Sequence, residues 1–352
     1  MEKLRAGVIG LGAMGKSHLE AYGRMAETVE VAALCDIKEE TLAEAGQRFP
    51  GARTAADFRE MLEPGDLDLV SVATMPRTHC EIAVAALESG AHVLCEKPFA
   101  MNVAEADRML AAAERGGRMI QVGTNMRHML EAGILRELVA SGKLGKPAYI
   151  RAWTYYQSIP WWGPHYIRDT AAGGALASTA IHITDVALWV AGSPGLVSVS
   201  GSTHRMFPHK RAETAPNAEE RDRYDVEDIA AAHIRLDTGA TFVLEGTWAH
   251  DRLEAHYSFE MICERGTICF DPLSVLMDEG GEIVDRTPTD YAEPGRYHSW
   301  GDSVNREITR FVTAIRQGTE PSQTPREIRN LQLIQDSVYE SARTGREVRL
   351  DE

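Results

Sequence analysis

The pattern of hydrophobic and polar positions along this chain changes near residue 125. Up to that point, short apolar runs alternate with segments in which apolar residues recur every three to four positions. The runs predict strands buried on both faces, and the segments between them predict amphipathic helices. The predicted strands cover residues 6–9, 29–34, 67–73, 91–95 and 119–122, and the predicted helices cover residues 14–25, 39–49, 79–88 and 103–114. This order predicts βαβ units and a doubly wound parallel sheet.

Beyond residue 125 the pattern is mainly that of strands. A helix over residues 130–140 comes first, and helices over residues 304–317 and 325–344 close the chain. Residues 237–239 and 264–266 each hold a glycine that tolerates positive φ, which predicts two hairpin turns. The predicted strands cover residues 148–156, 196–202, 229–236, 240–248, 257–263 and 267–270. We therefore predict an α/β fold with two domains, 1–124 and 125–352. The second sheet is mostly antiparallel, and the C-terminal helix is free to pack back on the first domain.

The charge balance narrows the choice of partner. The 352 residues carry 37 basic and 52 acidic side chains, a net charge of −15, which disfavours nucleic acid because a polyanion needs a basic surface. We see no apolar run long enough to span a bilayer, and the N-terminus lacks the apolar segment of a signal peptide. The five cysteines include no Cys-x-x-Cys pair, which disfavours a disulfide framework or a cysteine zinc site. These features predict a cytoplasmic protein with no membrane partner.

A glycine-rich turn follows the first predicted strand. It consists of Gly10, Leu11, Gly12, Ala13, Met14 and Gly15. Between a strand and a helix, such glycines make the tight turn, let the backbone approach a pyrophosphate and allow the helix to pack closely on the strand. The free N–H groups at the start of the helix then face the phosphates. Asp36 ends the next strand, where an acid binds the adenosine ribose hydroxyls and repels a 2′-phosphate, which favours NAD over NADP.

Glu96, Lys97 and Pro98 follow the predicted strand over residues 91–95. Ligands of parallel sheets bind at the carboxyl ends of the strands, so Lys97 is placed to hydrogen-bond a substrate hydroxyl. A nicotinamide cation beside it would lower its pKa, because like charge disfavours the ammonium form. From the sequence alone, a surface ion pair between Glu96 and Lys97 explains the position equally well.

Taken in order, these motifs resemble those of the Gfo/Idh/MocA oxidoreductases, the relatives of glucose–fructose oxidoreductase and inositol dehydrogenase. The resemblance covers nearly the whole chain. The matching pieces are residues 10–15, Asp36, residues 73–76 with His79, residues 90–98, residues 123–127, and residues 173–176 with His182 and Asp185. The resemblance implies a Rossmann domain followed by an α/β domain with a large open sheet, through which family members build dimers or tetramers.

The family's cofactor-binding roles carry over to the matching positions. The resemblance implies that Lys97 lies beside the nicotinamide and the reacting hydroxyl. It also allows a cis bond between Lys97 and Pro98, which would aim the lysine. The residues that would hold the nicotinamide end are Thr74, Pro76, His79, Glu96 and Asn125.

His182 would be the general acid or base that exchanges the hydroxyl proton, since an imidazole titrates near the working pH. Sugar and inositol dehydrogenases of the family usually have an aspartate four residues earlier, where this chain has Ser178. On an α-helix Ser178, His182 and Asp185 share a face, so Ser178 is an orienting contact, although it cannot accept a proton as a carboxylate does. His182 and Asp185 alone are too few ligands for zinc, and we expect no metal.

Further candidates for substrate binding come from the segment over residues 153–162, which is rich in aromatic residues. Such rings pack on the apolar faces of sugars, and they suit a core or a subunit interface equally well. Arg168 matches a family position near the substrate, and a solvated surface charge explains it as well. The complete set of substrate-binding candidates is Lys97, Arg127, Tyr156, Trp162, Arg168, Ser178 and His182.

The sequence therefore predicts an oxidoreductase that transfers hydride between NAD and a secondary alcohol or ketone of a sugar, sugar derivative or cyclitol. Its catalytic residues are Lys97 and His182, and the expected assembly is a homodimer or homotetramer. Two alternatives stay open. One is a glycoside-cleaving enzyme that uses tightly bound NAD for transient oxidation and elimination. The other is a non-catalytic NAD or sugar sensor, against which the proton-transfer groups weigh.

Overall fold

The computed structural model of the chain describes residues 2–159, 163, 165–207, 219, 222–251, 256–288 and 300–350. The chain divides into two compact units. Unit 1 holds Met1–Asn125 and Trp300–Gln332, and unit 2 holds Met126–Ser299 and Leu333–Glu352. Helix α10 (Trp300–Gln317) and the first part of α11 (Pro325–Thr344) therefore belong to unit 1, whereas the division by sequence assigned all residues after 124 to the second domain.

Unit 1 is built on a six-stranded parallel sheet with the strand order β3-β2-β1-β4-β5-β6. The strands are β1 (Leu4–Ile9), β2 (Val29–Cys35), β3 (Arg53–Ala55), β4 (Leu69–Val72), β5 (His92–Cys95) and β6 (Ile120–Val122). This confirms the doubly wound parallel sheet, to which the structure adds the short strand β3. The order reverses between β1 and β4, and sheets of this kind bind ligands beyond the carboxyl ends of the strands at such a point.

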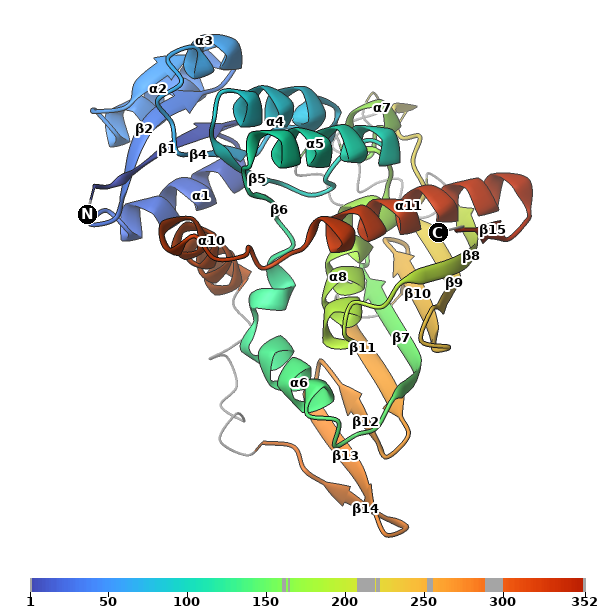
Figure 1. Cartoon of the computed structure of the whole chain (residues 1–352). Coiled ribbons are helices and arrows are strands. Elements are labelled where there is room, and N and C mark those ends of the chain that lie inside the picture. Colours follow the sequence, from blue (N-terminus) through green and yellow to red (C-terminus); the bar gives the residue numbers. More distant parts are fainter. Residues whose placement is uncertain are drawn as a thin grey trace. The chain divides into compact units, whose positions relative to one another are not determined.

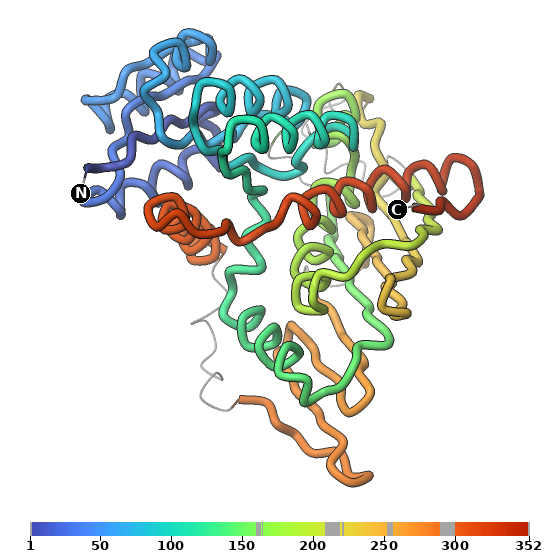
Figure 2. Tube along the Cα trace, in the orientation of Figure 1, coloured from blue at the N-terminus to red at the C-terminus, as the bar shows by residue number. Residues whose placement is uncertain are grey.

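Helices cover both faces of this sheet (Figure 1). On one face, α1 (Ala13–Arg24) and α10 form a core that includes Leu19, Ile308 and Phe311, and Figure 2 shows these two helices side by side. On the other face, α4 (His79–Glu88) and α5 (Val103–Gly116) form a second core. The remaining helices of the unit's first segment are α2 (Glu39–Arg48), α3 (Phe58–Leu62) and η1 (Pro76–Thr78), and η2 (Asn125–His128) starts at its end.

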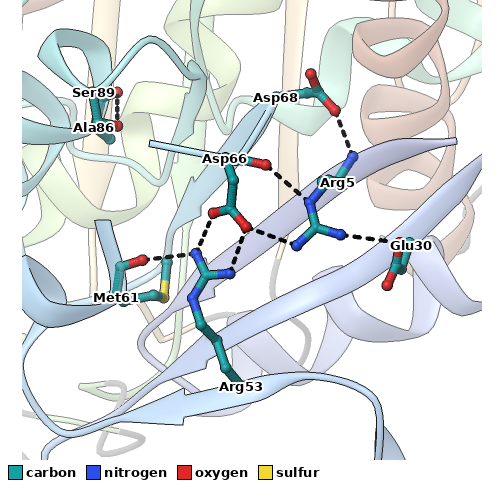
Figure 3. A network of polar contacts seen from close by, with 8 residues as sticks. All are labelled: Arg5, Glu30, Arg53, Met61, Asp66, Asp68, Ala86 and Ser89. Carbon is teal, nitrogen blue, oxygen red and sulfur yellow. Dashed lines mark hydrogen bonds and ion pairs between the residues drawn. The ribbon is translucent and has the colours of Figure 1, made fainter. Parts of the chain in front are cut away.

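Arginine–aspartate contacts tie together the amino ends of several strands of unit 1 (Figure 3). Arg5 of β1 donates from Nη2 to Asp66 Oδ2 at 2.8 Å, and its backbone N–H donates to Asp68 Oδ2 at 2.7 Å. Arg53 of β3 donates to Asp66 Oδ1 at 2.6 Å and to the Met61 carbonyl at 2.9 Å. The hydrogen bond from Arg53, helped by Arg5, lowers the pKa of Asp66. This network joins β1, β3 and the chain before β4 at the edge opposite the predicted ligand site.

Unit 2 contains a nine-stranded sheet with the order β14-β13-β12-β11-β7-β10-β9-β8-β15. All neighbouring strands are antiparallel except β7 and β10, which confirms the mostly antiparallel sheet. The strands are β7 (Pro147–Tyr155), β8 (Leu196–His204), β9 (Ile229–Leu236), β10 (Thr241–Thr247), β11 (His256–Cys263), β12 (Gly266–Cys269), β13 (Ser274–Glu279), β14 (Glu282–Asp285) and β15 (Val348–Arg349). Strands β13, β14 and β15 extend the sheet beyond the predicted ones.

The two predicted hairpins use their glycines differently. Gly239, between β9 and β10, adopts a φ of +84°, as expected. The hairpin between β11 and β12 is also present, but Gly266, at the start of β12, has no positive φ. A Cβ on Gly266 would lie 2.5 Å from the Leu276 carbonyl oxygen, so the residue must be glycine because β13 approaches it closely.

One face of the nine-stranded sheet packs against α6 (Leu130–Ala140), α8 (Ile181–Val190) and the second part of α11. The helical stretch Arg168–Val190, which comprises α7 (Arg168–Ala171), η3 (Leu176–Ala180) and α8, spans 23 residues. By length and composition this stretch could cross a membrane, which corrects the statement that no run is long enough. Its apolar window is completely buried within unit 2, as in the core helix of a globular domain.

Candidate active site

The glycine turn between β1 and α1 forms an open cradle. Gly10 has a φ of +87°, and a Cβ there would lie 2.6 Å from the Ala73 carbonyl oxygen. A Cβ on Gly15 would lie 2.0 Å from the Gly10 carbonyl oxygen, so glycine is required for α1 to pack on the turn. Gly12 is exposed, and a Cβ there would meet nothing within 4 Å. The protein's own backbone thus needs Gly10 and Gly15, whereas the space beside Gly12 is open to a ligand.

The first turn of α1 has the features of an anion-binding site. Gly12 is the N-cap and makes no side-chain cap, and the first turn, which includes Ala13 and Met14, contains no acidic residue. The first N–H groups of a helix lack partners within the helix and carry a partial positive charge. The turn therefore fits a pyrophosphate group.

Asp36 supports the same turn from the end of β2. Its Oδ2 accepts a hydrogen bond from the Leu11 N–H at 2.7 Å, and its Oδ1 accepts one from the Lys38 N–H at 2.8 Å. Each carboxylate oxygen has a second lone pair, so Asp36 can accept ribose hydroxyls while it keeps both bonds. Its negative charge disfavours a 2′-phosphate, so the cradle fits NAD.

Thr74, Pro76 and His79 lie in the connection from β4 to α4. His79 is buried, and its ring nitrogens lie 3.0 Å from the Thr74 carbonyl oxygen and 2.9 Å from the Pro98 carbonyl oxygen. Burial lowers the pKa of His79, although the carbonyls oppose this shift. His79 therefore joins the loop of Thr74 to the loop that follows Lys97. Pro76 is the first residue of the short helix η1, which lies between Thr74 and His79 in the chain.

Glu96 and Lys97 follow β5 at the same carboxyl edge of the sheet as the glycine turn, and the Lys97–Pro98 bond is cis. Glu96 is only 4% exposed. Its Oε1 lies 3.1 Å from His18 Nε2, and its Oε2 accepts the backbone N–H of Lys97 at 3.2 Å. Burial would raise the pKa of Glu96, but His18 and the charge of Lys97 outweigh it, and the pKa is lowered. Glu96 is thus a buried, ionised carboxylate, which excludes a surface ion pair with Lys97.

Lys97 is half-buried at this edge. Burial lowers the pKa of its ammonium, and the negative charge of Glu96 opposes the shift. Such a lysine exchanges a proton closer to neutral pH than a surface lysine does, which is a common property of residues in active sites.

Asn125 lies at the end of the first segment of unit 1. Its Nδ2 donates to Ser303 Oγ of α10 at 2.7 Å. Its Oδ1 is buried and has no hydrogen-bond partner among the residues that the structure describes. An unsatisfied buried acceptor calls for an explanation, and the donor of a bound cofactor, such as a nicotinamide amide, would satisfy it.

Sequence reasoning missed three polar residues behind Glu96. His18 and Tyr22 of α1 and Ser71 of β4 are buried and hydrogen-bonded to one another. The available signal was the spacing of His18 and Tyr22, which lie four residues apart on the buried face of the helix. Ser71 gave no such signal, because a single serine in an apolar strand is common.

In unit 2, His182 follows an irregular helical segment. Residues Leu176–Ala180 form the π-helix η3, and α8 begins at Ile181. Ser178 and His182 are both buried. The spacing from which their shared face was predicted is that of an α-helix, whereas Ser178 lies in the π-helix, so the shared face stays a prediction. π-helical turns are rare in proteins, but those that occur are often found at functional sites.

Glu227, which sequence reasoning also missed, anchors the start of that segment. Its carboxylate accepts the N–H groups of Gly174 and Leu176 at 3.0 Å, and Tyr339 OH donates to Oε1 at 3.0 Å. A Cβ on Gly174 would lie 1.9 Å from the Glu227 carbonyl oxygen, and one on Gly173 would lie 1.8 Å from Tyr339 Oη. The two glycines are therefore needed for close packing around Glu227. Burial raises the pKa of Glu227, although the backbone N–H groups oppose this shift.

Arg127, a predicted substrate contact, is buried in an ion pair. Its Nε donates to Asp185 Oδ2 at 2.8 Å, its Nη2 donates to Asp185 Oδ1, and its guanidinium carbon lies 5.6 Å from the centre of the Trp189 ring. The structure thus engages both Arg127 and Asp185 in holding α8. Among the described residues, no group of three His, Cys, Asp or Glu side chains is placed to hold a metal ion.

Two further predicted substrate contacts, Tyr156 and Arg168, make contacts of other kinds. Tyr156 packs in an aromatic cluster with Tyr166, Tyr224 and Trp248, and burial raises its pKa to about 12. Arg168 is exposed, its backbone N–H donates to Asp225 Oδ1 at 2.7 Å, and its guanidinium carbon lies 5.5 Å from the centre of the Tyr339 ring. Trp162 lies outside the described residues.

The doubly wound sheet, the glycine cradle with Asp36 and the orphaned acceptor of Asn125 define an NAD-binding domain with a lysine at its carboxyl edge. Two sequence models of one family match this chain. The oxidoreductase family with an NAD-binding Rossmann fold matches residues 4–124, and the GFO/IDH/MocA C-terminal domain matches residues 134–269. The chain belongs to the Gfo/Idh/MocA oxidoreductase family.

Curated relatives match this chain over nearly its full length. It is 26% identical to D-glucoside 3-dehydrogenase of Escherichia coli K12, over 99% of this chain and 97% of that one. It is 28% identical to levoglucosan dehydrogenase of Pseudarthrobacter phenanthrenivorans, over 97% of each chain, and 27% identical to myo-inositol 2-dehydrogenase of Thermotoga maritima, over 99% of each.

Solved structures show the same fold. A levoglucosan dehydrogenase in complex with NADH and levoglucosan superposes with a TM-score of 0.86 at 25% identity. An oxidoreductase domain protein from Kribbella flavida superposes with a TM-score of 0.89 at 27% identity. Each alignment covers the whole of both chains.

Proposed function

We propose that this protein is an NAD-dependent dehydrogenase that interconverts a secondary alcohol and a ketone on a sugar, sugar derivative or cyclitol. The observation that carries the proposal is the position of Lys97. It is a half-buried ammonium group with a lowered pKa, at the same sheet edge as the dinucleotide cradle. The named relatives act on ring-shaped polyhydroxylated molecules, namely glucosides, levoglucosan and inositol, which supports the substrate class.

The chain's own residues have separate tasks in this proposal. Gly10, Gly12 and Gly15 shape the cradle, and Asp36 binds the adenosine ribose. Lys97 hydrogen-bonds the oxygen of the reacting carbon, and the ionised Glu96 behind it favours the ammonium form. When bound, the nicotinamide ring supplies the acceptor or donor of hydride.

His182 of unit 2 is assigned the exchange of the hydroxyl proton. An imidazole suits this task because its ordinary pKa lies close to neutral pH. The Glu227 carboxylate accepts backbone N–H groups at the start of the π-helix that precedes His182, which anchors this segment. Ser178, in place of the family's usual aspartate, offers a hydrogen bond and no proton acceptor.

The test is a screen of sugars, glycosides and cyclitols for NADH formation, run beside an NADP control. In Lys97→Ala, NAD binding measured by calorimetry should stay close to wild type, while turnover falls by at least about a hundredfold, as expected when the charged donor to the reacting oxygen is lost. Lys3→Ala, at an exposed lysine of the same unit, is the matched control and should change neither quantity. Turnover of Lys97→Ala near the wild-type rate would refute the assignment.

The same screen separates the proposal from glycoside cleavage. A dehydrogenase forms NADH in a one-to-one ratio with oxidised sugar. Transient oxidation followed by elimination would release the aglycone without any accumulation of NADH, so a glycoside that behaves in this way would replace the proposal. Binding of NAD with no turnover of any sugar would favour a sensor.

We further propose a homodimer or homotetramer that forms through the outer face of the nine-stranded sheet. Tyr149, Ile262 and Leu276 form a row on that face across β7, β11, β12 and β13, with Thr267 between the last two. Ile262 and Leu276 are 42% and 37% exposed, and an exposed apolar row of this kind favours association. Light scattering should give a smaller particle for Ile262→Lys and an unchanged one for Leu130→Lys, a partly exposed position on α6. An unchanged particle for Ile262→Lys would contradict the proposal.

We also propose a cytoplasmic location. All five cysteines are free thiols, as expected for a protein that resides in a reducing compartment. Cell fractionation should recover the protein with cytosolic markers, and recovery with periplasmic or secreted markers would contradict this proposal.

A further inference from the structure

A chain of buried polar side chains runs from helix α1 to the loop of Lys97. Tyr22 Oη lies 2.7 Å from Ser71 Oγ, which lies 2.9 Å from His18 Nδ1. His18 Nε2 lies 3.1 Å from Glu96 Oε1, and Glu96 Oε2 accepts the Lys97 backbone N–H at 3.2 Å. None of Tyr22, Ser71, His18 and Glu96 is more than 4% exposed.

The layer that contains this chain is otherwise apolar. Ser71 of β4 lies beside Val8 of β1 and Leu94 of β5 in the sheet, and both neighbours are fully buried in the core that α1 covers. Polar side chains cost free energy in such a layer unless their hydrogen bonds are satisfied. Leucine or valine would fill the same space without this cost, so the polar chain calls for a reason other than stability.

The hydrogen bonds of the chain have one consistent direction. Ser71 is the only hydrogen-bond partner of the Tyr22 hydroxyl among the described residues. If Ser71 donated to Tyr22, the buried Tyr22 O–H would have no acceptor, at a substantial cost. Tyr22 therefore donates to Ser71, Ser71 donates to His18 Nδ1, and His18 donates from Nε2 to Glu96. Burial raises the pKa of Tyr22 far above its usual value, which keeps this first donor protonated.

We propose that Tyr22, Ser71 and His18 are positioning residues for Lys97. Together they hold the His18 ring so that its Nε2 donates to Glu96, which keeps that carboxylate in place. The carboxylate in turn favours the ammonium form of Lys97. The catalytic meaning of this chain rests on the proposed dehydrogenase function, but its effect on Lys97 exists without cofactor or turnover.

Other titratable groups near Glu96 stay neutral. The Cys95 thiol, on the same strand, has a pKa raised well above its usual value by burial and by Glu96. His79 of α4 has a pKa lowered by burial. Loss of the His18 donor removes a contribution that lowers the pKa of Glu96. A Glu96 that takes up a proton more readily supports the Lys97 charge less, so the pKa of Lys97 falls.

The experiment measures how fast the Lys97 amine reacts with acetic anhydride as a function of pH, by mass spectrometry on the protein without cofactor. In His18→Leu the profile should move to lower pH, and the rate at neutral pH should rise about tenfold for each unit by which the Lys97 pKa falls. His18→Gln keeps a donor and an acceptor and should restore most of the wild-type profile. Ser71→Ala removes a single oxygen atom and should shift the profile in the same direction even if His18→Leu folds poorly.

The matched control is His92→Gln. His92 is the first residue of β5, the strand that Glu96 follows, so it lies at the opposite end of that strand. Its Nδ1 accepts the Met119 N–H at 2.9 Å. His92→Gln should leave the Lys97 profile unchanged. If the His18 and Ser71 variants also kept the wild-type profile and only had lower melting temperatures, their role would be structural alone and the proposal would be overturned. A shifted profile in a protein that oxidises no sugar would leave the positioning chain standing and refute the proposed function.

Discussion

Gly12→Ala should abolish most NAD binding and leave unit 1 folded. The wild-type φ of −69° at Gly12 is accessible to alanine, and the added Cβ meets no protein atom within 4 Å. Alanine is a poorer N-cap than glycine, which costs about 0.5–1 kcal/mol of stability. The same Cβ occupies the space into which a pyrophosphate must come. We expect NAD to bind at least about a hundredfold more weakly, a loss of about 2.8 kcal/mol.

Thermal unfolding with and without NAD measures both effects at once. A ligand at 100 times its Kd stabilises the folded protein by about 2.7 kcal/mol, which for a unit of this size raises Tm by roughly 5–10 °C. At the same NAD concentration, a hundredfold weaker Kd leaves about 0.4 kcal/mol, or roughly 1 °C. Gly12→Ala should thus lose the NAD-dependent rise in Tm while its Tm without NAD falls by only a few degrees.

Two other glycines of the same helix are the controls. Gly23 is exposed in α1 with nothing within 4 Å of its Cβ position, so Gly23→Ala should keep the full NAD response and gain about 0.5–1 kcal/mol of stability. Gly15→Ala places a Cβ 2.0 Å from the Gly10 carbonyl oxygen and should lower Tm strongly even without NAD. If Gly12→Ala retained the wild-type rise in Tm, the cradle would not be the phosphate site.

Three further outcomes are expected. Asp36→Asn keeps an acceptor for the Leu11 N–H but removes the charge that repels a 2′-phosphate, so the preference for NAD over NADP should fall about tenfold in initial-rate assays; an unchanged ratio would contradict this. Glu227→Gln keeps one oxygen for the Gly174 and Leu176 N–H groups but puts an NH2 donor in place of the second oxygen, 3.0 Å from the Gly174 nitrogen. Unfolding should therefore cost about 1–3 kcal/mol less and kcat should fall; wild-type values of both would argue against an anchoring role. Asp66→Asn should cost up to about 1 kcal/mol at neutral pH, because the ion pairs are largely exposed. Since the pKa of Asp66 is lowered in the folded state, this difference should shrink as the pH falls below about 4; a difference that persists in acid would exclude the ion pairs as its cause.

Local patterns in the sequence predicted the elements that local chemistry determines. The bounds of α6, β9 and α11 agree with the predicted ranges. Clear signals mark where such elements begin or end, for example Ser141 after α6 and Pro325 at the start of α11. The three-residue strand β3 has too short a pattern to stand out, and it exists because it pairs with β2. The stripe on α10 indicated a buried face but not the sheet against which that face packs.

The candidate site divides in the same way. The cradle, Asp36, Glu96 and Lys97 lie at strand ends, so their place at one sheet edge followed from the order of the strands. The bond from His18 to Ser71 and the bonds from Glu227 to Gly174 each join residues 53 positions apart. No local pattern predicts such contacts, because they depend on which strand lies next to which helix. The start of the π-helix before His182 was hidden for a related reason, since it is bonded to the distant residue Glu227.

The place of α10 in unit 1 has a consequence for synthesis of the chain on the ribosome. Strands β1 to β6 are complete by Val122, whereas α10, which covers Leu19 and Tyr22 on one face of that sheet, begins only at Trp300. At about 5–20 residues per second, roughly 10–35 seconds pass between these two points. During that interval Leu19 and Tyr22 lack the apolar side chains of α10 that later pack against them. Unit 1 therefore reaches its final form only after residues 126–299, which belong to unit 2, have been translated.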